Sequence, residues 1–252
     1  MTMKKVLFLL SMMFIFLRPI LAQQYDKVWA VGSPVSTMTF QGDSIVLANL
    51  ENTTTQSFIT LGNICDKNGN FLFFSNGINV YNRLGQIMPN GDSLSYPSKY
   101  YDQVVASGMP SVQGVIILPK PNDTNQYYIF HYSPADTDLV DGGYESLNFY
   151  YSIVDMRLDS GKGSVTQKNV FLIQSEILSA SRLSACRHAN GRDWWIVKNA
   201  WHENIYYKFL LTPEGIQGSF IQQIGPKYGL RNELPASACF NPDGSMYASV
   251  TA

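Results

Sequence analysis

Residues 62–91 read GNICDKNGNFLFFSNGINVYNRLGQIMPNG, and this stretch decides the fold. Two short apolar runs, NIC and FLFFS, lie on either side of an Asn-Gly pair formed by Asn68 and Gly69. Such residues tolerate the positive φ angles that a tight hairpin turn requires. The stretch therefore predicts a β-hairpin, followed by a further strand in INVYNR.

The pattern of short strand, turn and apolar strand returns three times further along the chain. Its landmarks are Cys65, Gly114, Cys186 and Cys239, which recur roughly every 50 residues apart from one longer interval before Cys186. This period is typical of kelch-like β-propeller repeats, and an inserted loop accounts for the longer interval. Each repeat of this kind would bury its faces only against its neighbours.

The rest of the chain also favours strands. Aromatic and β-branched residues are frequent, turn signals return at the spacing of about 8–12 residues that is typical of all-β domains, and no long amphipathic helix is indicated. The segment GDSIVLANLE at 42–51 predicts a strand with an apolar face at Ile45 and Leu47. We expect an all-β fold, a β-propeller-like array of four-stranded antiparallel blades. The alternative is an irregular β-sandwich whose hairpins share only their turn chemistry.

Residues 1–22 have the features of a secretory signal peptide. Lys4 and Lys5 precede an apolar run, and Ala22 offers a small residue at a cleavage site. The run is too short to cross about 30 Å of hydrocarbon, and an Arg-Pro pair interrupts it. We expect export to the cell surface or medium, a mature domain at 23–252 and no membrane span after cleavage. The alternative is an uncleaved N-terminal anchor.

The charge of the chain argues against nucleic acid as a partner. Lys and Arg number 18, Asp and Glu number 19, and the formal net charge is −1. Removal of the basic signal peptide would make the mature chain more acidic. Binding to a phosphate backbone or to an anionic membrane is therefore not expected.

Cys65, Cys186 and Cys239 occupy the same position of the repeated pattern, as small apolar residues within a strand. Their odd number and shared position favour three buried thiols over one disulfide and one free cysteine. No pair has C-x-x-C or C-x-x-H spacing, and the three histidines form no helix-based array. We predict no metal site and no cofactor.

Asp66, Asn68 and Asn70 place oxygen ligands at alternate positions, as a calcium loop does at its start. However, the glycine comes at the fourth position of the loop instead of the sixth, and the twelfth position, Gly77, is not an acid. A hairpin turn is therefore the better interpretation.

An aromatic cluster offers the candidate ligand-binding residues. Its members are Trp194, Trp195, Trp201, Tyr206 and Tyr207. Alternation along the strand WWIVK would put one tryptophan inside and its neighbour outside. Core packing is the expected role of most of the cluster. The outward-facing member of the Trp194–Trp195 pair, together with Trp201, is the predicted ligand contact.

No catalytic residue is predicted, because the chain has no G-x-S-x-G elbow, Walker loop or dinucleotide fingerprint. The alternative to a binding module is a carbohydrate-active propeller, which would need two carboxylates on either side of a sugar. Acids that could face a propeller mouth are Asp155, Glu176, Asp193, Glu203 and Glu233. A third possibility is a structural spacer within a long adhesin.

Five segments carry a family resemblance. They are residues 63–91, 115–130 (VIILPKPNDTNQYYIF), 150–172 (YYSIVDMRLDSGKGSVTQKNVFL), 185–201 (ACRHANGRDWWIVKNAW) and 238–250 (ACFNPDGSMYASV). The chain resembles the N-terminal propeller-like region of large secreted proteins of Bacteroidetes-type bacteria. The last segment is also similar to the F-x-P-D-G turn of WD40-like propeller repeats.

The resemblance implies a non-enzymatic binding or scaffold module with a protein or glycan partner, as one part of a larger multidomain chain. Proteins of that family continue into immunoglobulin-like or PKD modules and end in a gliding-associated or type IX secretion sorting domain. Here the chain stops inside a predicted strand, and four blades are fewer than the six to eight that are commonest. We therefore expect an open, incomplete array from a longer protein.

Overall fold

A computed structural model of the chain describes residues 24–50, 57, 59–95, 107–133, 145–227 and 236–250. The predicted signal peptide lies outside these ranges. Strands dominate the described residues, and the one helical element is the short 3-10 helix η1 (Asp159–Gly161), so the predicted all-β class is confirmed. No helix in this part of the chain is long and apolar enough to cross a membrane.

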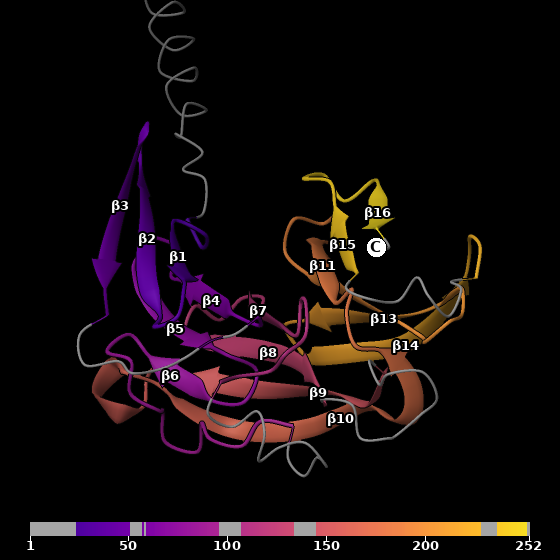
Figure 1. Ribbon diagram of the computed structural model, residues 1–252, viewed down its shortest axis with the longest axis horizontal. Coiled ribbons are helices and arrows are strands. Elements are labelled where there is room, and N and C mark those ends of the chain that lie inside the picture. The colour runs from indigo at the N-terminus through magenta and orange to yellow at the C-terminus, as the bar shows by residue number, and fades with distance from the viewer. Residues whose placement is uncertain are drawn as a thin grey trace, which may run out of the picture.

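The strands form five antiparallel sheets, and in each sheet the strands follow one another in sequence order (Figure 1). The first sheet contains β1 (Val28–Val31), β2 (Ser36–Gln41) and β3 (Ser44–Asn49). The second contains β4 (Gly62–Cys65), β5 (Phe71–Ser75) and β6 (Val80–Asn82). The third contains β7 (Val115–Pro119), β8 (Gln126–Tyr132), β9 (Glu145–Asp155) and β10 (Ser164–Ser179). The fourth contains β11 (Ser184–Arg187), β12 (Trp194–Asn199), β13 (Ile205–Thr212) and β14 (Gly215–Gln223), and the fifth contains β15 (Ser237–Phe240) and β16 (Tyr247–Val250).

The hydrophobic core lies in slices between neighbouring sheets. In β5, Phe73 belongs to the slice between the second and third sheets, whereas the adjacent Phe74 belongs to the slice between the first and second. In β8, Tyr127 and Ile129 face the second sheet. The alternate residues of the same strand, Tyr128, Phe130 and Tyr132, face the fourth. Successive side chains of a strand point to opposite faces, so an apolar strand without polar alternation is buried on both sides.

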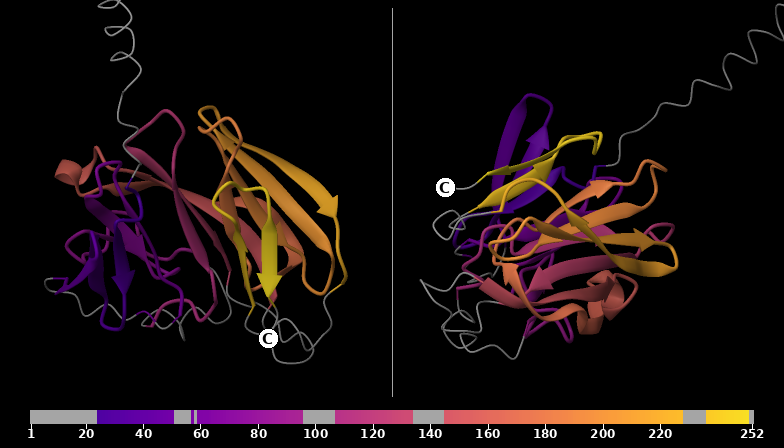
Figure 2. Two further views of the ribbon diagram at one scale, coloured as in Figure 1. Left: turned by 90° about the horizontal axis from the view of Figure 1, so that it is seen from above. Right: turned by 90° about the vertical axis from the view of Figure 1, so that its right-hand side faces the viewer.

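The first strands of successive sheets lie next to one another. β1 contacts β4, β4 contacts β7, and β11 contacts β15. A cavity of about 410 Å³ is lined by residues at the first strands of four sheets, namely 59–61, 113–116, 183–185 and 238–240. Residues at or next to the first strands of four sheets therefore converge on one cavity, and the longer strands of the third and fourth sheets, β8 to β10, β13 and β14, can be followed in Figures 1 and 2.

The array is open among the described residues. β3 pairs only with β2, and β16 pairs only with β15, on the two sides of the opening at the top of Figure 1. The predicted strand at 42–51 exists as β3, but its apolar face is not buried: Ile45 and Leu47 are 59% and 69% exposed. Both faces of β3 are open, since all six of its residues are exposed and β3 is the edge strand of the first sheet.

The hairpin turn predicted at Asn68 and Gly69 is confirmed. The amide of Gly69 donates to the carbonyl of Asp66 (3.0 Å), and Gly69 has a φ of +84°. The carboxylate of Asp66 accepts from the amides of Asn68 and Asn70 at 2.8 and 2.9 Å. Partial burial acts to raise the pKa of Asp66, but the hydrogen bonds from Asn70, Asn68 and Gly69 hold it below its ordinary value. Its oxygens thus stabilise the turn.

Side-chain amides connect first strands that have no backbone ladder between them. Asn63 of β4 accepts from the amide of Ala30 (2.9 Å) and donates to the carbonyl of Val28 (2.7 Å). Gln113, just before β7, accepts from the amide of Ala238 in β15 (2.9 Å) and donates to the carbonyl of the same residue (2.7 Å). In both places one amide side chain replaces a peptide group and satisfies an otherwise open strand edge.

Replacing Asn63 with alanine should therefore lower the free energy of unfolding by about 1–3 kcal/mol, because two partly buried backbone groups of β1 lose their partners. Urea denaturation followed by far-UV circular dichroism measures this. Asn68→Ala, in the exposed turn of the same sheet, is the matched control and should change the stability by less than about 0.5 kcal/mol. Equal losses in the two variants would contradict this role of Asn63.

All three cysteines are free, but their burial decreases along the chain. Cys65 is buried as predicted, with its sulfur 3.6 Å from the carbonyl oxygen of Val28. Cys186 is half-buried, and Cys239 is exposed, so the prediction of three buried thiols is wrong for these two. The reason is position: the first sheet covers Cys65, whereas no described sheet follows the one that contains Cys239.

Thiol labelling of the folded protein should distinguish the three positions. Cys239 should react rapidly with a small thiol reagent, and Cys65 should react only after unfolding, since burial both shields the thiol and raises its pKa. Burial also raises the pKa of Cys186, which should react at an intermediate rate. Mass spectrometry of the labelled peptides provides the measurement, and rapid labelling of Cys65 in the native protein would contradict the packing described above.

Candidate ligand-binding surface

The three tryptophans predicted to contact a ligand lie apart. Trp194 and Trp195 begin β12 and point to opposite faces of the fourth sheet, whereas Trp201 follows the other end of that strand. Trp194 packs against the core between the third and fourth sheets. All three side chains are half-buried. The alternation of Trp194 and Trp195 is as predicted, but the structure does not bring the three together into one site.

Trp195 and Trp201 have different neighbours. Trp195 is flanked by the rings of His188 and Phe220, with centroid distances of 5.8 and 5.9 Å. Trp201 lies edge-on to His202 at 4.2 Å. Trp195 is thus the member of the pair that faces away from the core between the third and fourth sheets.

The acids considered for catalysis also lie apart. Asp155 ends β9, Asp193 and Glu203 lie beyond opposite ends of β12, Glu176 is exposed on β10, and Glu233 lies outside the described residues. Arg157 donates to Asp155 through Nε (2.9 Å) and Nη2 (2.5 Å). The guanidinium of Arg192 contacts Asp193 at 2.7 Å, and the ammonium of Lys227 contacts Glu203 at 2.8 Å. Each of these three carboxylates therefore serves a local ion pair.

The histidines differ in environment. His131 is fully buried between the hydroxyls of Ser95 and Ser152, at 2.7 and 3.0 Å, and burial lowers its pKa to about 3. His188 accepts a hydrogen bond from the amide of Asn190 within a turn. Among the described residues, no group of three or more His, Cys, Asp and Glu side chains gathers in a way that could hold a metal ion.

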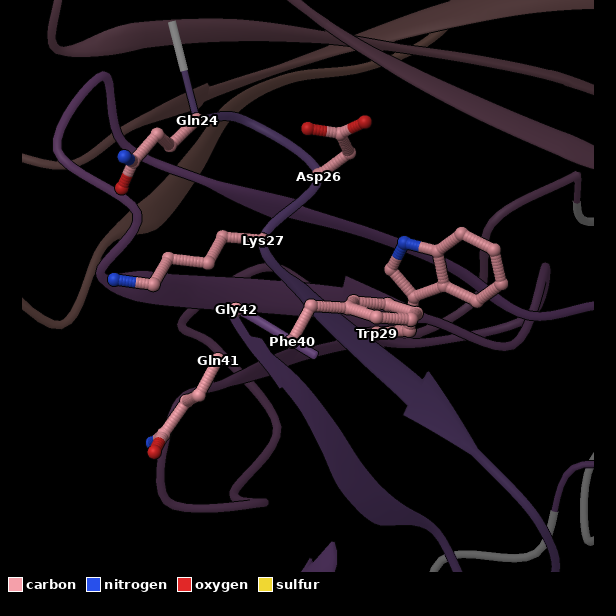
Figure 3. Close-up of a pocket in the computed structure, with 7 residues that line it drawn as sticks. All are labelled: Gln24, Asp26, Lys27, Trp29, Phe40, Gln41 and Gly42. Atoms are coloured by element: carbon pink, nitrogen blue, oxygen red, sulfur yellow. The ribbon is translucent and has the colours of Figure 1, made fainter. Parts of the chain in front are cut away.

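An open cleft lies on the first sheet, around Trp29. Its volume is about 750 Å³, and its lining residues are Gln24, Asp26, Lys27, Trp29, Phe40, Gln41 and Gly42. The Trp29 side chain is 47% exposed, and Phe40 meets it edge-on with a centroid distance of 5.1 Å. The polar ends of Gln24, Lys27 and Gln41 lie on one side of the cleft, and the indole of Trp29 lies on the other (Figure 3). The carboxylate of Asp26 lies at the edge between the two sides.

Local contacts fix the shape of this cleft. The amide of Gln24 donates to the carbonyl of Lys67, and the amide of Phe40 donates to that of Lys27, so the entering segment is tied to the second sheet and to β2. A side chain at position 69 would lie 2.5 Å from a carbon of Lys27, so Gly69 allows the segment to approach the turn. Asp26 and Trp29 also line a second, smaller cavity of about 210 Å³.

Trp29 is a candidate site residue that the sequence alone did not indicate. Its segment, VWAV in β1, has the same apolar character as strands whose side chains are buried, so its composition does not separate exposed from buried positions. Charged neighbours do not separate them either: Asp26 and Lys27 precede Trp29, but Arg192 and Asp193 directly precede the mostly buried strand β12.

Comparison with known proteins gives no match: no protein-family model, no curated protein and no solved structure is significantly similar to the chain.

The Asp155–Arg157 pair predicts a pH dependence of stability. The hydrogen bonds from Arg157 lower the pKa of Asp155 to about 2, below the value of about 3.9 of an unfolded chain. The pair therefore stabilises the fold fully above pH 4, and this contribution is lost as the pH falls from about 4 to about 2. Asp155→Asn should lower Tm by a few degrees at pH 7, and the difference from the wild type should disappear near pH 2.

Thermal unfolding monitored at several pH values tests this effect. Asp43→Asn, in the exposed turn between β2 and β3, is the matched control and should leave Tm unchanged at neutral pH. A Tm difference between Asp155→Asn and the wild type that is the same at pH 7 and pH 2.5 would contradict the ion-pair explanation.

Proposed function

We propose that this chain is a non-catalytic binding module of an exported protein, with a β-propeller-like architecture and a glycan-binding cleft at Trp29. The exposed indole in a polar cleft carries the proposal. An aromatic face packs against the apolar face of a sugar ring, while amides, a carboxylate and an ammonium group hydrogen-bond to hydroxyls. The cleft has the volume of a small-ligand site, whereas a protein partner would need a broad surface of about 800 Å².

Several observations support the propeller-like interpretation. Successive sheets are meanders in sequence order, the first strands β1 and β4, β4 and β7, and β11 and β15 contact one another, and residues at or next to the first strands of four sheets line one cavity. In such an architecture short turns on a rigid scaffold present the binding groups. The cleft at Trp29 lies beside the turn of the second sheet, which agrees with this arrangement.

The basic and apolar N-terminal sequence supports export, and together with the resemblance described above it supports a location at the cell surface or outside the cell. A non-catalytic role is supported by the ion pairs of Asp155, Asp193 and Glu203, since each carboxylate is engaged with a cation of its own sheet or turn. The predicted contacts Trp195 and Trp201 lie apart, so each is a separate alternative contact and the two do not form one surface.

A panel of neutral oligosaccharides, titrated into the purified protein by isothermal titration calorimetry, tests the proposal. Trp29→Ala should weaken binding about tenfold or more, because the aromatic contact area is lost. Trp195→Ala is the matched control and should leave the affinity unchanged. A loss of affinity in Trp195→Ala alone would instead assign the site to the fourth sheet, and no binding of any oligosaccharide would refute a glycan ligand.

A further inference from the structure

Most outer strands of the described sheets have a feature that hinders pairing with another chain. A loop covers the edge of β6, since the amide of Met88 donates to the carbonyl of Val80 (2.9 Å) and the amide of Val80 donates to the carbonyl of Gly91 (2.7 Å). β10 pairs with β9 through four register shifts, β14 pairs with β13 through one, and β16 has only four residues. Covering loops, bulges and short strands all prevent edge-to-edge association.

The outer edge of β3 has none of these features. Its six residues, SIVLAN, pair with β2 without a register shift and include no charged residue and no proline. All six are exposed, and among the described residues β3 pairs only with β2. The hairpin of β2 and β3 extends beyond the other sheets at the upper left of Figure 1. A regular, exposed and apolar edge of this kind is typical of a strand that pairs with another chain.

The backbone of β3 offers hydrogen-bonding groups at this edge. The carbonyl of Ala48 faces β2, because it accepts from the hydroxyl of Thr37 at 3.1 Å. In an antiparallel pair, the backbone groups of successive residues point alternately toward the partner strand and away from it. The amides and carbonyls of Ile45 and Leu47 therefore point away from β2.

The side chains of β3 are complementary to those of a second β3 in antiparallel pairing. A two-fold axis at Val46 places this residue opposite Val46 of the second copy, and it places Ile45 opposite Leu47 of the second copy. Ile45 and Leu47 are the residues with outward backbone groups, so these opposed pairs can exchange hydrogen bonds. Apolar side chains then lie opposite one another on both faces of the pair. An axis at Leu47 would instead place Ile45 opposite the polar side chain of Asn49.

The face of the first sheet that carries Ile45 and Leu47 is apolar across all three strands. Phe40 is opposite Ile45, Met38 is opposite Leu47, and Trp29 is opposite Met38. Residues that lie opposite one another on neighbouring strands project from the same face. Pairing of two β3 edges would therefore join two apolar strips into one.

We propose that β3 is a self-association edge, at which two copies of this chain pair antiparallel about a two-fold axis at Val46. Their three-stranded first sheets thereby form one continuous sheet. The apolar self-complementarity of this register favours a second copy over a different protein as the partner. A six-residue edge is smaller than the standard interface of about 800 Å² per partner, so the association is weak and depends on concentration. The proposal does not rest on the glycan proposed for the Trp29 cleft.

Sedimentation velocity of the purified protein, at concentrations from about 5 µM to about 500 µM, tests the proposal. The average mass of the wild type should rise toward that of a dimer. Val46→Lys places two ammonium groups opposite each other at the axis and should weaken dimerisation at least about tenfold. Ile221→Lys, which changes an exposed apolar residue of β14, is the matched control and should associate as the wild type does.

Two double variants test the register. Ile45→Lys combined with Leu47→Glu places opposite charges across from each other in both opposed pairs. Ile45→Lys combined with Leu47→Lys removes the same apolar side chains but places like charges there. The first should dimerise at least about tenfold more tightly than the second, and this difference should shrink as the salt concentration rises. Equal association of the two double variants would contradict the register.

Hydrogen exchange at the amides of Ile45 and Leu47 distinguishes a second copy from another segment of the same chain. Exchange that is fast in dilute protein and slows as the concentration rises supports the proposal. Slow exchange in the dilute monomer would show that the chain covers its own edge, and it would overturn the proposal. A wild type that is monomeric at every concentration, or that associates no more tightly than Val46→Lys, would overturn it as well.

Discussion

Burial of both faces of the apolar strands is the constraint on which the rest of the structure depends. Phe73 and Phe74 are adjacent in β5 and both are completely buried, each in a different slice of core. Full burial of such a side chain contributes about 1.5–3 kcal/mol. Neither contribution is available to the hairpin alone, since both of its faces would remain in water. A strand of this kind is stable only when a sheet lies on each side of it.

Stacking of the sheets in turn creates a requirement at their inner edges. Among the described residues each first strand pairs along one edge only, and its other edge has no backbone ladder. Asn63 and Gln113 meet this requirement with side-chain amides. The cavity of about 410 Å³ lies beside these open edges, since residues 113–116, 183–185 and 238–240 line it.

The sequence contains most of the information for the local structure and less for the burial. Hairpins follow from the turn chemistry of residues such as Asp66 and Gly69, which act within a few positions. Whether Cys239 and Leu47 are exposed depends on whether other strands or sheets lie beside them. The amino-acid sequence of each strand does not predict these neighbours. Likewise, nearness in sequence suggests that Trp194, Trp195 and Trp201 form one site. In the structure, Trp194 and Trp195 point to opposite faces of β12, and Trp201 lies beyond the other end of this strand.

The same reasoning explains why the two ligand-sized spaces beside the turns differ in chemistry. At Trp29, the first sheet has no described neighbour on its outer face, so an indole remains exposed among groups of both charge signs. At Trp194, a neighbouring sheet covers most of the ring, and the remaining space is bounded by turns whose acids are engaged with arginines outside or beside it. An outer sheet face therefore leaves aromatic surface open to solvent, whereas the gap of about 300 Å³ beside Trp194 is lined by turn residues such as Lys120, Asp123 and Arg192.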